Sequence, residues 1–201
     1  LKVSERSRPF PTEHFIIRML CRAGALSHSH LHYFIDLFER ETIMGTDKVK
    51  EYLANFGLAD RVMEFKESSA TVAEAAADLG CEPARIGKTM AFDVAGQPML
   101  VVIAGDGKVD NAKYKAKFHC KACMIKPDEL VVKVGHPMGG VCPFAVCPGV
   151  PVYLDESLRR FDIVYPAAGT AASAVRLAVP ELEHAAENFS GWVDIAKGWQ
   201  E

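Results

Sequence analysis

Residues 135–144 read GHPMGGVCPF, and this stretch decides how the middle of the chain folds. Three glycines and two prolines within ten residues exclude a regular helix or a central strand here. The pair Gly139-Gly140 also lets the backbone approach another group closely, because glycine has no side chain. We therefore expect a loop between two apolar segments that presents backbone N–H groups to a ligand.

A single lysine, Lys88, stands upstream of this loop at the start of an apolar strand, between Ile86 and Met90. Burying an ammonium group without a partner is costly, so a lysine at this place needs an explanation. One interpretation is a side chain at a strand end that buries its stem and keeps its charge in water. The other is a cation aimed at a carbonyl or phosphate oxygen in a cleft. The spacing of the residues leaves both interpretations open.

Length and composition indicate one domain with a proper hydrophobic core. The chain has 201 residues, of which 49% are hydrophobic and 24% charged, as is typical of a soluble globular protein. Its net charge of −3 argues against a general nucleic-acid binder, and no apolar run approaches the ~20 residues that cross a bilayer. Six cysteines without a visible secretory signal suggest free thiols in a reducing compartment, so we expect a cytoplasmic protein.

The beginning of the chain differs from the rest. Residues 12–23 and 27–41 each have the apolar spacing of a helix, and the sequence then reads like a fresh start at Met44. We expect an N-terminal helical extension over residues 1–43 and a main domain over residues 44–201. The extension is either an added helical pair or an upstream segment that the domain does not need.

Short strands alternate with short helices from residue 61 onward. Thr71 and Glu74 form a capping-box pattern at the start of a helix that Gly80 ends. Residues 95–98, Ala-Gly-Gln-Pro, have the composition of a hairpin turn. The expected strands are 62–65, 89–94, 99–104, 150–154, 163–165 and 174–178, and the expected later helices begin at 110, 127 and 180. This order favours a mixed α/β or α+β domain over a doubly wound fold.

The chain lacks the motifs of several common enzyme classes. The glycine loop is not a Walker loop, because no Gly-Lys-Ser/Thr follows it, and its spacing is not that of a dinucleotide fingerprint. Neither Gly-x-Ser-x-Gly nor His-Glu-x-x-His occurs. An enzyme built from these residues would therefore use water, or a group of its substrate, as the nucleophile.

The cysteines suggest a competing idea. Cys120-x2-Cys123 and Cys142-x4-Cys147 could together supply four thiolates to a structural zinc ion. The second spacing is loose, and the Pro-Phe pair inside it is awkward for a ligand turn. A redox dithiol at the first pair lacks the strand-then-helix setting that such motifs have. We expect neither a metal nor another cofactor.

Lysines are concentrated in one part of this acidic protein. Six of them fall within 19 residues: Lys108, Lys113, Lys115, Lys117, Lys121 and Lys126. A solvated helix face is the common explanation for such a cluster. Contact with a phosphate backbone is the other, and it would allow nucleic-acid binding despite the net charge.

These segments, read together, resemble the YbaK/ProX family of aminoacyl-tRNA deacylases, which also occurs as an editing domain inserted in some prolyl-tRNA synthetases. The matching segments follow one another in the family's order: 75–83 leading into 86–89, then 135–144, 152–158 and 165–170. The first is the family's helix followed by its Lys-Thr strand, and the last contains its Ala-Gly turn. The resemblance extends from Met44 to Trp199 and leaves the first 43 residues outside.

The resemblance implies a fold and a reaction. The fold is of the α/β (mixed α+β) class, with a curled, largely antiparallel mixed sheet around a pocket and helices outside. The reaction is hydrolysis of the ester that joins a wrong amino acid to the 3′ end of a tRNA, often tRNA-Pro, and no metal is needed. The implied partners are the acceptor end of an aminoacyl-tRNA and prolyl-tRNA synthetase.

The resemblance also implies roles for particular residues. Lys88 matches the family's key catalytic residue, and the loop at Gly139-Gly140 would contact the substrate through its backbone. The expected substrate-binding residues are Thr89, Gly135, His136, Gly139, Gly140, Pro143, Phe144, Asp155, Ala168 and Gly169. The expected tRNA-binding residues are Lys113, Lys115, Lys117 and Lys121. Because a lysine of ordinary pKa stays protonated at pH 7, Lys88 would bind the carbonyl or terminal phosphate and would be a poor general base.

Departures from the family pattern bear on specificity. The branch that is specific for cysteine has polar residues where this chain has Ala167 and Ala174, and the loop ends in Ala145 where glycine is common. A less polar pocket makes alanine, serine or another small amino acid as plausible a substrate as cysteine. Two alternatives stay open: a non-catalytic tRNA-binding or synthetase-associated module of the same fold, and a zinc-stabilised interaction protein.

Overall fold

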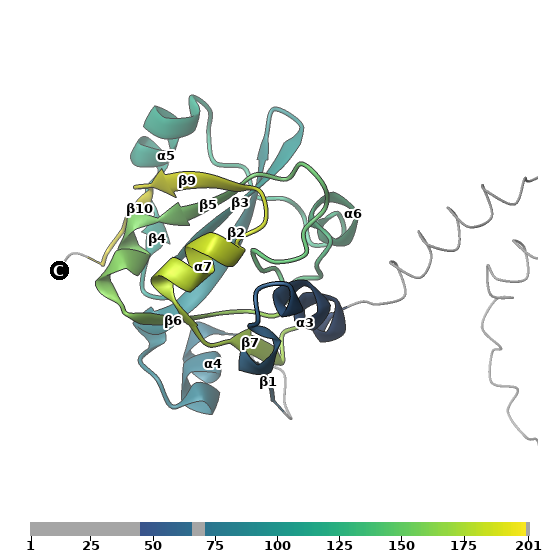
Figure 1. Cartoon of the computed structure of the whole chain (residues 1–201). Coiled ribbons are helices and arrows are strands. Elements are labelled where there is room, and N and C mark those ends of the chain that lie inside the picture. Colours follow the sequence, from purple (N-terminus) through teal and green to yellow (C-terminus); the bar gives the residue numbers. More distant parts are fainter. Residues whose placement is uncertain (1–44, 66–70, 200–201) are drawn as a thin grey trace, which may run out of the picture. The chain divides into compact units, whose positions relative to one another are not determined.

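The computed structural model describes residues 45–65 and 71–199, which are drawn as coloured ribbon in Figure 1. The helical extension predicted over residues 1–43 lies outside the described residues. Within the described ranges, no helix is long and apolar enough to cross a bilayer.

The two longest strands form a hairpin, β2 (Ile86–Val94) and β3 (Gln97–Ala104). Ala95 and Gly96 connect them with positive φ angles of 53° and 86°, as a two-residue hairpin turn of this kind requires. The Gly96 N–H donates to a carboxylate oxygen of Asp93 at 2.7 Å and closes the turn. The hairpin predicted from the composition of residues 95–98 is confirmed.

This hairpin is the centre of a six-stranded sheet with the order β8-β6-β2-β3-β5-β9. The other strands are β5 (Val152–Asp155), β6 (Ile163–Pro166), β8 (Leu177–Ala178) and β9 (Phe189–Val193). β2 pairs with β6, β3 with β5, and β5 with β9 in parallel, whereas β2–β3 and β6–β8 are antiparallel. Figure 1 shows the sheet curling, with helices around it. The expected class, a mixed α/β domain with a curled sheet, is confirmed.

Short elements complete the domain. Two small antiparallel sheets join β1 (Val62–Glu64) to β7 (Ser173–Val175) and β4 (Lys108–Val109) to β10 (Ala196–Lys197). The α-helices are α3 (Thr46–Ala54), α4 (Val72–Leu79), α5 (Asn111–Phe118), α6 (Leu130–Val134) and α7 (Val179–Ala185). The 3-10 helices are η1 (Ala59–Arg61), η2 (Pro83–Arg85) and η3 (Glu156–Arg160).

The start of α4 follows directly from its sequence. The Thr71 side chain accepts from the Glu74 N–H at 3.2 Å, and the Glu74 carboxylate accepts from the Thr71 N–H at 3.0 Å. Gly80 ends the helix in the left-handed conformation. The capping box and the stop are both as predicted.

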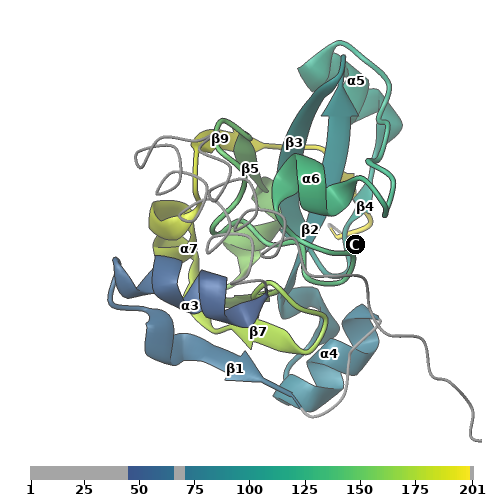
Figure 2. The ribbon, with the colours of Figure 1, turned by 90° about the vertical axis from the view of Figure 1, so that its right-hand side faces the viewer.

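The two faces of the β2–β3 hairpin contact two separate hydrophobic clusters. Ala91 lies opposite Leu100, and both belong to the first cluster, which includes α3, α6 and α7. Phe92 lies opposite Met99, and both belong to the second cluster, which includes Tyr114 of α5. In Figure 2, α3 and α7 lie to the left of the hairpin and α5 lies near its upper end. Because side chains alternate along a strand, successive residues of β2 lie on opposite faces of the sheet, one toward the first cluster and the next toward the second.

Candidate active site

A cavity of about 290 Å³ lies beside the first cluster, between α4, the first half of β2 and the loop that follows α6. Its wall includes Val72, Ala75, Leu79, Gly87, Lys88, Thr89, Ala91, Met124, Ile125, Leu130, Met138, Gly139, Val141, Tyr165, Ala167, Ala171, Ser173 and Ala174. Most of these side chains are apolar, and many are alanine. Protein sites for small molecules have this character: an apolar wall with a few polar groups that fix orientation.

Thr89 provides the most informative polar atom in the wall. It lies opposite Val102 in the hairpin, and Val102 belongs to the first cluster, so the Thr89 side chain is on the cavity's face of the sheet. Its hydroxyl oxygen is buried and has no hydrogen-bond partner among the described residues. A buried hydroxyl without a partner costs about 1–3 kcal/mol, so a ligand group that hydrogen-bonds to it would recover that free energy.

Ser173 also brings a hydroxyl to the wall, but it is already engaged. Its oxygen lies 2.8 Å from the Thr170 hydroxyl and 3.2 Å from the Thr170 N–H. It also donates to the Thr170 carbonyl at 3.1 Å. These contacts form the turn before β7, so Ser173 shapes the cavity and leaves Thr89 as the unsatisfied group.

Lys88 also contributes to the wall, and its ammonium is partly buried. The Nζ atom donates to the Gly107 carbonyl at 2.7 Å. Burial lowers the pKa of Lys88, a nearby carboxylate on Asp106 opposes that effect, and Lys108 adds to it. Among the described residues Lys88 makes no ion pair. Its ammonium has three N–H donors, and one hydrogen bond uses one of them, so two donors remain available to a ligand.

The Lys88 side chain does not point straight into the cavity, as the interpretation of a cation in a cleft would have it. Lys88 lies opposite Ile103, which belongs to the second cluster, whereas Thr89 is on the cavity's face. Gly107, which accepts its hydrogen bond, is not among the residues of the cavity wall. The ammonium is therefore held outside the residues of the cavity wall, by a backbone carbonyl of the turn between β3 and β4.

The glycine loop packs against a second turn through glycine on both sides. A Cβ atom added at Gly140 would collide with the Gly169 carbonyl, and one at Gly139 would lie 2.7 Å from the Ala171 Cβ. The Gly140 N–H donates to the Pro137 carbonyl at 3.0 Å and is not available to a ligand. Gly139 lines the cavity, and its N–H donates in none of the hydrogen bonds of the described residues.

The sequence model of one protein family, described as the aminoacyl-tRNA editing domain, matches residues 66–185. The chain belongs to the aminoacyl-tRNA editing domain family. It is 41% identical over 159 residues to the uncharacterized protein YwhH of Bacillus subtilis, a match that covers 78% of this chain and 100% of YwhH. The YbaK/ProX resemblance is confirmed.

Longer proteins and solved structures contain related domains. The proline–tRNA ligase of Geobacillus kaustophilus is 26% identical over 157 residues, which cover 70% of this chain and 28% of the ligase. A crystal structure of a candidate trans-editing enzyme for prolyl-tRNA synthetase has a TM-score of 0.69 and 27% identity, covering 76% of this chain and 97% of that one. The hypothetical protein APE2540 has a TM-score of 0.66 and 30% identity, covering 75% and 99%.

Within this editing domain, His136 and Cys142 form a buried pair behind the glycine loop. The His136 Nε2 lies 2.7 Å from the Phe144 carbonyl, and the Cys142 sulfur lies 3.5 Å from the same nitrogen. Burial lowers the pKa of His136 to about 4 and raises the pKa of the Cys142 thiol to about 12. Both groups are therefore neutral at pH 7, so they hold the loop together and cannot supply a thiolate nucleophile.

Several predicted substrate-binding residues lie behind the wall of the cavity. Of the predicted substrate-binding residues, Thr89 and Gly139 line it, as does Lys88, which was predicted to be catalytic. The others are not among the lining residues: Gly135, His136, Gly140, Pro143, Phe144, Asp155, Ala168 and Gly169. Phe144 and Ala168 are part of the first cluster, and Gly135 ends α6 with a φ of 87°. The structure thus places most of the glycine loop as support for the wall.

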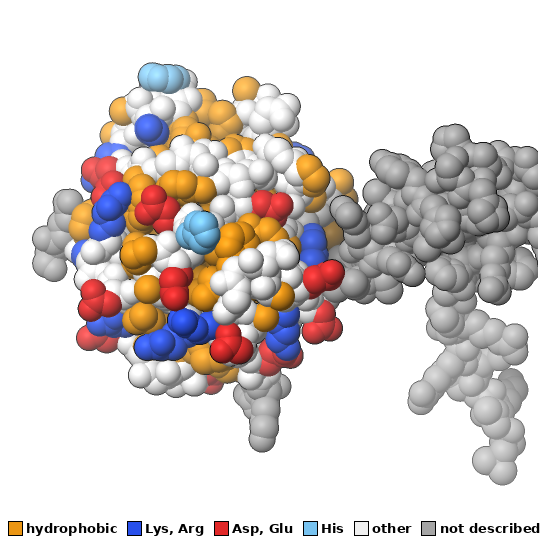
Figure 3. Space-filling view, viewed as in Figure 1, with side chains coloured by type: hydrophobic (Ala, Val, Ile, Leu, Met, Phe, Trp, Pro, Cys, Tyr) orange, Lys and Arg blue, Asp and Glu red, His pale blue; other side chains and the backbone are white. Residues whose placement is uncertain are grey.

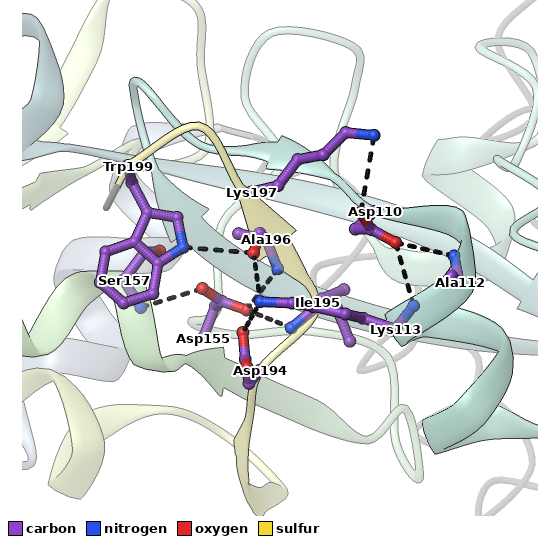
Figure 4. A network of polar contacts seen from close by, with 10 residues as sticks. All are labelled: Asp110, Ala112, Lys113, Asp155, Ser157, Asp194, Ile195, Ala196, Lys197 and Trp199. Carbon is purple, nitrogen blue, oxygen red and sulfur yellow. Dashed lines mark hydrogen bonds and ion pairs between the residues drawn. The ribbon is translucent and has the colours of Figure 1, made fainter. Parts of the chain in front are cut away.

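Asp155 is the clearest case of a residue with a structural position. Its carboxylate is fully buried and accepts three backbone N–H bonds, from Ser157 at 2.9 Å, Ile195 at 2.8 Å and Ala196 at 3.1 Å. Figure 4 shows this carboxylate between η3 and the segment leading into β10. Asp155 therefore joins three segments of the editing domain and does not face the cavity.

The four predicted tRNA-binding lysines are not equivalent. Lys113 Nζ donates to Asp194 at 2.7 Å and to the Ala196 carbonyl at 3.0 Å, so it ties α5 to the segment before β10. Lys115, Lys117 and Lys121 are exposed and form no ion pair with the described residues. On the face seen in Figure 3, Lys and Arg side chains are interspersed with Asp and Glu side chains.

The zinc alternative is not supported. Cys142 is buried in the first cluster, whereas Cys120 packs against the second cluster on the other face of the sheet. Among residues 45–65 and 71–199, no three side chains of His, Cys, Asp or Glu come together in a way that could hold a metal ion. The four cysteines therefore belong to different parts of the fold.

Two methionines at the cavity were not identified from the sequence. Met124 is 57% exposed and Met138 is 70% exposed, and both line the cavity. They come from different loops, and nothing in their local sequence indicates that they meet.

Proposed function

We propose that this editing domain hydrolyses the ester bond of a mischarged aminoacyl-tRNA, with tRNA-Pro carrying a small wrong amino acid as the substrate. The observation that carries the proposal is the cavity of about 290 Å³ lined by Lys88, Thr89 and Gly139 in a chain of the editing family. The match to the whole length of YwhH supports action in trans, because that protein is no longer than the domain.

The size and wall of the cavity support a small aminoacyl group. Its volume is at the low end of the range of about 300–1,000 Å³ that is usual for ligand sites. Ala75, Ala91 and Ala174 leave room for a short side chain and offer it no charge. The unsatisfied Thr89 hydroxyl suits one polar group of the amino acid, such as its α-amino group.

Hydrolysis needs little covalent help from the protein, because an aminoacyl ester is already reactive. Water attacks the carbonyl carbon and gives up a proton, the ester C–O bond breaks, and the ribose oxygen takes up a proton, so that the free amino acid and the ribose hydroxyl are released. The Lys88 ammonium and the Gly139 N–H would stabilise the negative charge that develops on the carbonyl oxygen. Losing one such donor typically costs about 100-fold or more in rate.

The acceptor end of the tRNA would reach the cavity over its exposed rim. Met124 and Met138 offer apolar, adaptable surface to the terminal nucleoside. Lys115, Lys117 and Lys121 precede Met124 in the chain and have charges free to contact phosphates. Prolyl-tRNA synthetase is the implied partner, and the free thiols of the described cysteines suit the reducing cytoplasm where charged tRNA occurs.

A second candidate rests on the direction of Lys88. Its ammonium donates to Gly107, which is outside the cavity wall, and this arrangement also suits a module that binds the acceptor end without hydrolysing the ester. Such a module would hold aminoacyl-tRNA in the same cavity and leave the ester intact. Binding without turnover would distinguish it from the hydrolase.

The test is a deacylation panel with tRNA-Pro charged with alanine, serine, cysteine or proline. We expect release of at least one small amino acid, with proline spared. Lys88→Ala should lose about 100-fold in kcat/KM, whereas the matched control Lys197→Ala, an exposed lysine of β10, should keep the wild-type rate. Binding of every tRNA without release of any amino acid would favour the second candidate.

A further inference from the structure

The turn between β3 and β4 places the carbonyl that holds Lys88. Gly107 accepts from the Lys88 ammonium at 2.7 Å, and its own N–H donates to the Ala104 carbonyl at 2.9 Å. A Cβ atom added at Gly107 would lie 3.1 Å from that carbonyl and 3.3 Å from the Ala196 Cβ. The turn therefore fits tightly between β3 and β10, and glycine is the residue that fits it.

The same turn is fastened from outside by Arg160 of η3. The guanidinium binds the Asp106 carboxylate with two hydrogen bonds, of 2.6 Å and 3.0 Å. Paired bonds of this kind fix direction as well as distance. Asp106 directly precedes Gly107, so this pair fastens the turn next to the carbonyl that accepts from Lys88.

Arg160 is itself held from several sides. It donates to the backbone carbonyls of Ser157 at 2.9 Å and Trp199 at 3.0 Å. Its guanidinium carbon lies 4.7 Å from the centre of the Phe161 ring and 5.1 Å from the centre of the Trp199 ring. A guanidinium with this many contacts has little conformational freedom, so the Asp106 carboxylate that it binds is also held in place.

We propose that Arg160 and Asp106 are positioning residues for Lys88: they fix the β3–β4 turn so that the Gly107 carbonyl holds the lysine ammonium at the edge of the cavity. The inference rests on the proposed function, because it assigns a purpose to the placement of Lys88. Neither Arg160 nor Asp106 lines the cavity, so both act through Gly107.

The charges around Lys88 predict that its pKa shifts in opposite directions when Asp106 and when Arg160 is replaced. Asp106 and Lys108 are the charged groups that act on its ammonium, and the Asp106 carboxylate raises its pKa while Lys108 and burial lower it. Removing the Asp106 charge should therefore lower the Lys88 pKa further. Removing Arg160 frees the Asp106 carboxylate from its counter-ion, so the Lys88 pKa should rise.

The experiment measures the titration of Lys88 and the deacylation kinetics in the same full-length proteins. Lysines are labelled with ¹³C at Cε, and the Lys88 signal is assigned with Lys88→Arg. The variants are Asp106→Asn and Arg160→Gln, and the matched control is Arg159→Gln. Arg159 is the neighbouring arginine of η3, but it pairs with Glu156 and lies over the Trp192 ring.

We expect the Lys88 titration to move to lower pH in Asp106→Asn, to higher pH in Arg160→Gln, and not at all in Arg159→Gln. In Arg160→Gln, kcat should fall about tenfold with KM for the tRNA unchanged, because the loss is one of placement. General loosening of the fold would instead move the Lys88 titration in the same direction in both variants.

Three results would overturn the proposal: an unchanged Lys88 titration in both variants, shifts of the same sign, or opposite shifts with kcat unchanged. If wild type deacylates no tRNA, the proposed function fails. In that case the opposite shifts would still establish the link from Arg160 to Lys88, because NMR detects it without turnover.

Discussion

The Thr89 hydroxyl is a buried polar atom that the folded protein leaves without a partner, and it faces the cavity. Such a group weakens the fold, because it gives up hydrogen bonds to water and gains none in return. Because Thr89 lines the cavity, a substrate with a donor or acceptor at this place would complete its hydrogen bonding.

Replacing Thr89 with valine should therefore lower the deacylation activity without lowering the stability of the fold. We expect an unfolding free energy in urea equal to or slightly above that of wild type, because valine keeps the shape and removes the unsatisfied hydroxyl. We expect kcat/KM for deacylation to fall about tenfold, as the loss of one hydrogen bond of about 1.4 kcal/mol implies.

Thr89→Ser is the matched control, since it keeps the hydroxyl and should keep most of the activity. A valine variant that loses more than about 1 kcal/mol of stability while its activity stays at the wild-type level would show that the hydroxyl serves the fold.

Secondary-structure elements with local causes could be predicted from the sequence. The capping box of Thr71 and Glu74 and the turn at Ala95-Gly96 depend on residues within three positions of each other, and both are confirmed. The Asp110 side chain likewise accepts from the N–H groups of Ala112 and Lys113, at 2.8 Å and 3.1 Å, where a helix start was expected.

The side chains with distant partners could not be placed this way. Asp155 finds its backbone donors 40 residues away at Ile195, and Lys113 finds Asp194 across 81 residues. Lys88 could be singled out as unusual in an apolar strand, but its direction depends on a turn 19 residues later. The rim methionines lack any local pattern, so only the fold brings them to the cavity.

The glycine loop contains a titratable group whose effect on stability has a definite sign. Burial lowers the pKa of His136 to about 4, with a smaller contribution from Lys48, whereas the ordinary value in an unfolded chain is about 6.5. Below pH 6.5 the unfolded chain binds a proton that the folded protein does not. Stability is therefore present above pH 6.5 and is lost as the pH falls toward 4.

We expect the unfolding free energy contributed by this group to fall by roughly 2 kcal/mol between pH 7 and pH 5. Urea denaturation of wild type and His136→Gln at both pH values measures it, and the glutamine variant should show a drop that is smaller by this amount. Equal pH dependence in the two proteins would mean that His136 titrates normally in the folded state.

At the scale of the whole molecule, the Asp155 carboxylate helps to join the C-terminal segment to the sheet. Asp155 accepts from Ile195 and Ala196 and so connects β5 and η3 to β10, which in turn pairs with β4 beside the turn that holds Lys88. The stability of the β4–β10 pair therefore affects the turn that holds Lys88 beside the cavity.

Asp155→Asn should lower the unfolding free energy by about 2–3 kcal/mol, because both carboxylate oxygens accept backbone N–H bonds and asparagine replaces one of these oxygens with an NH2 donor. Hydrogen exchange should show faster exchange at Ile195 and Ala196, and the amides of α4 should be unaffected. Glu156→Gln, at the next position and more exposed, is the control that should leave both readouts near wild type. Uniform faster exchange throughout the domain would contradict a local joint.

The central claim is that the cavity of this editing domain hydrolyses a wrong aminoacyl ester with the help of Lys88. Single-turnover release of radiolabelled amino acid from Ala-tRNA-Pro and Pro-tRNA-Pro, by wild type and Lys88→Ala, tests it most directly. We predict that wild type releases alanine well above the uncatalysed rate and spares proline, and that Lys88→Ala is about 100-fold slower. Release by Lys88→Ala as fast as by wild type, or no release beyond the uncatalysed rate, would contradict it.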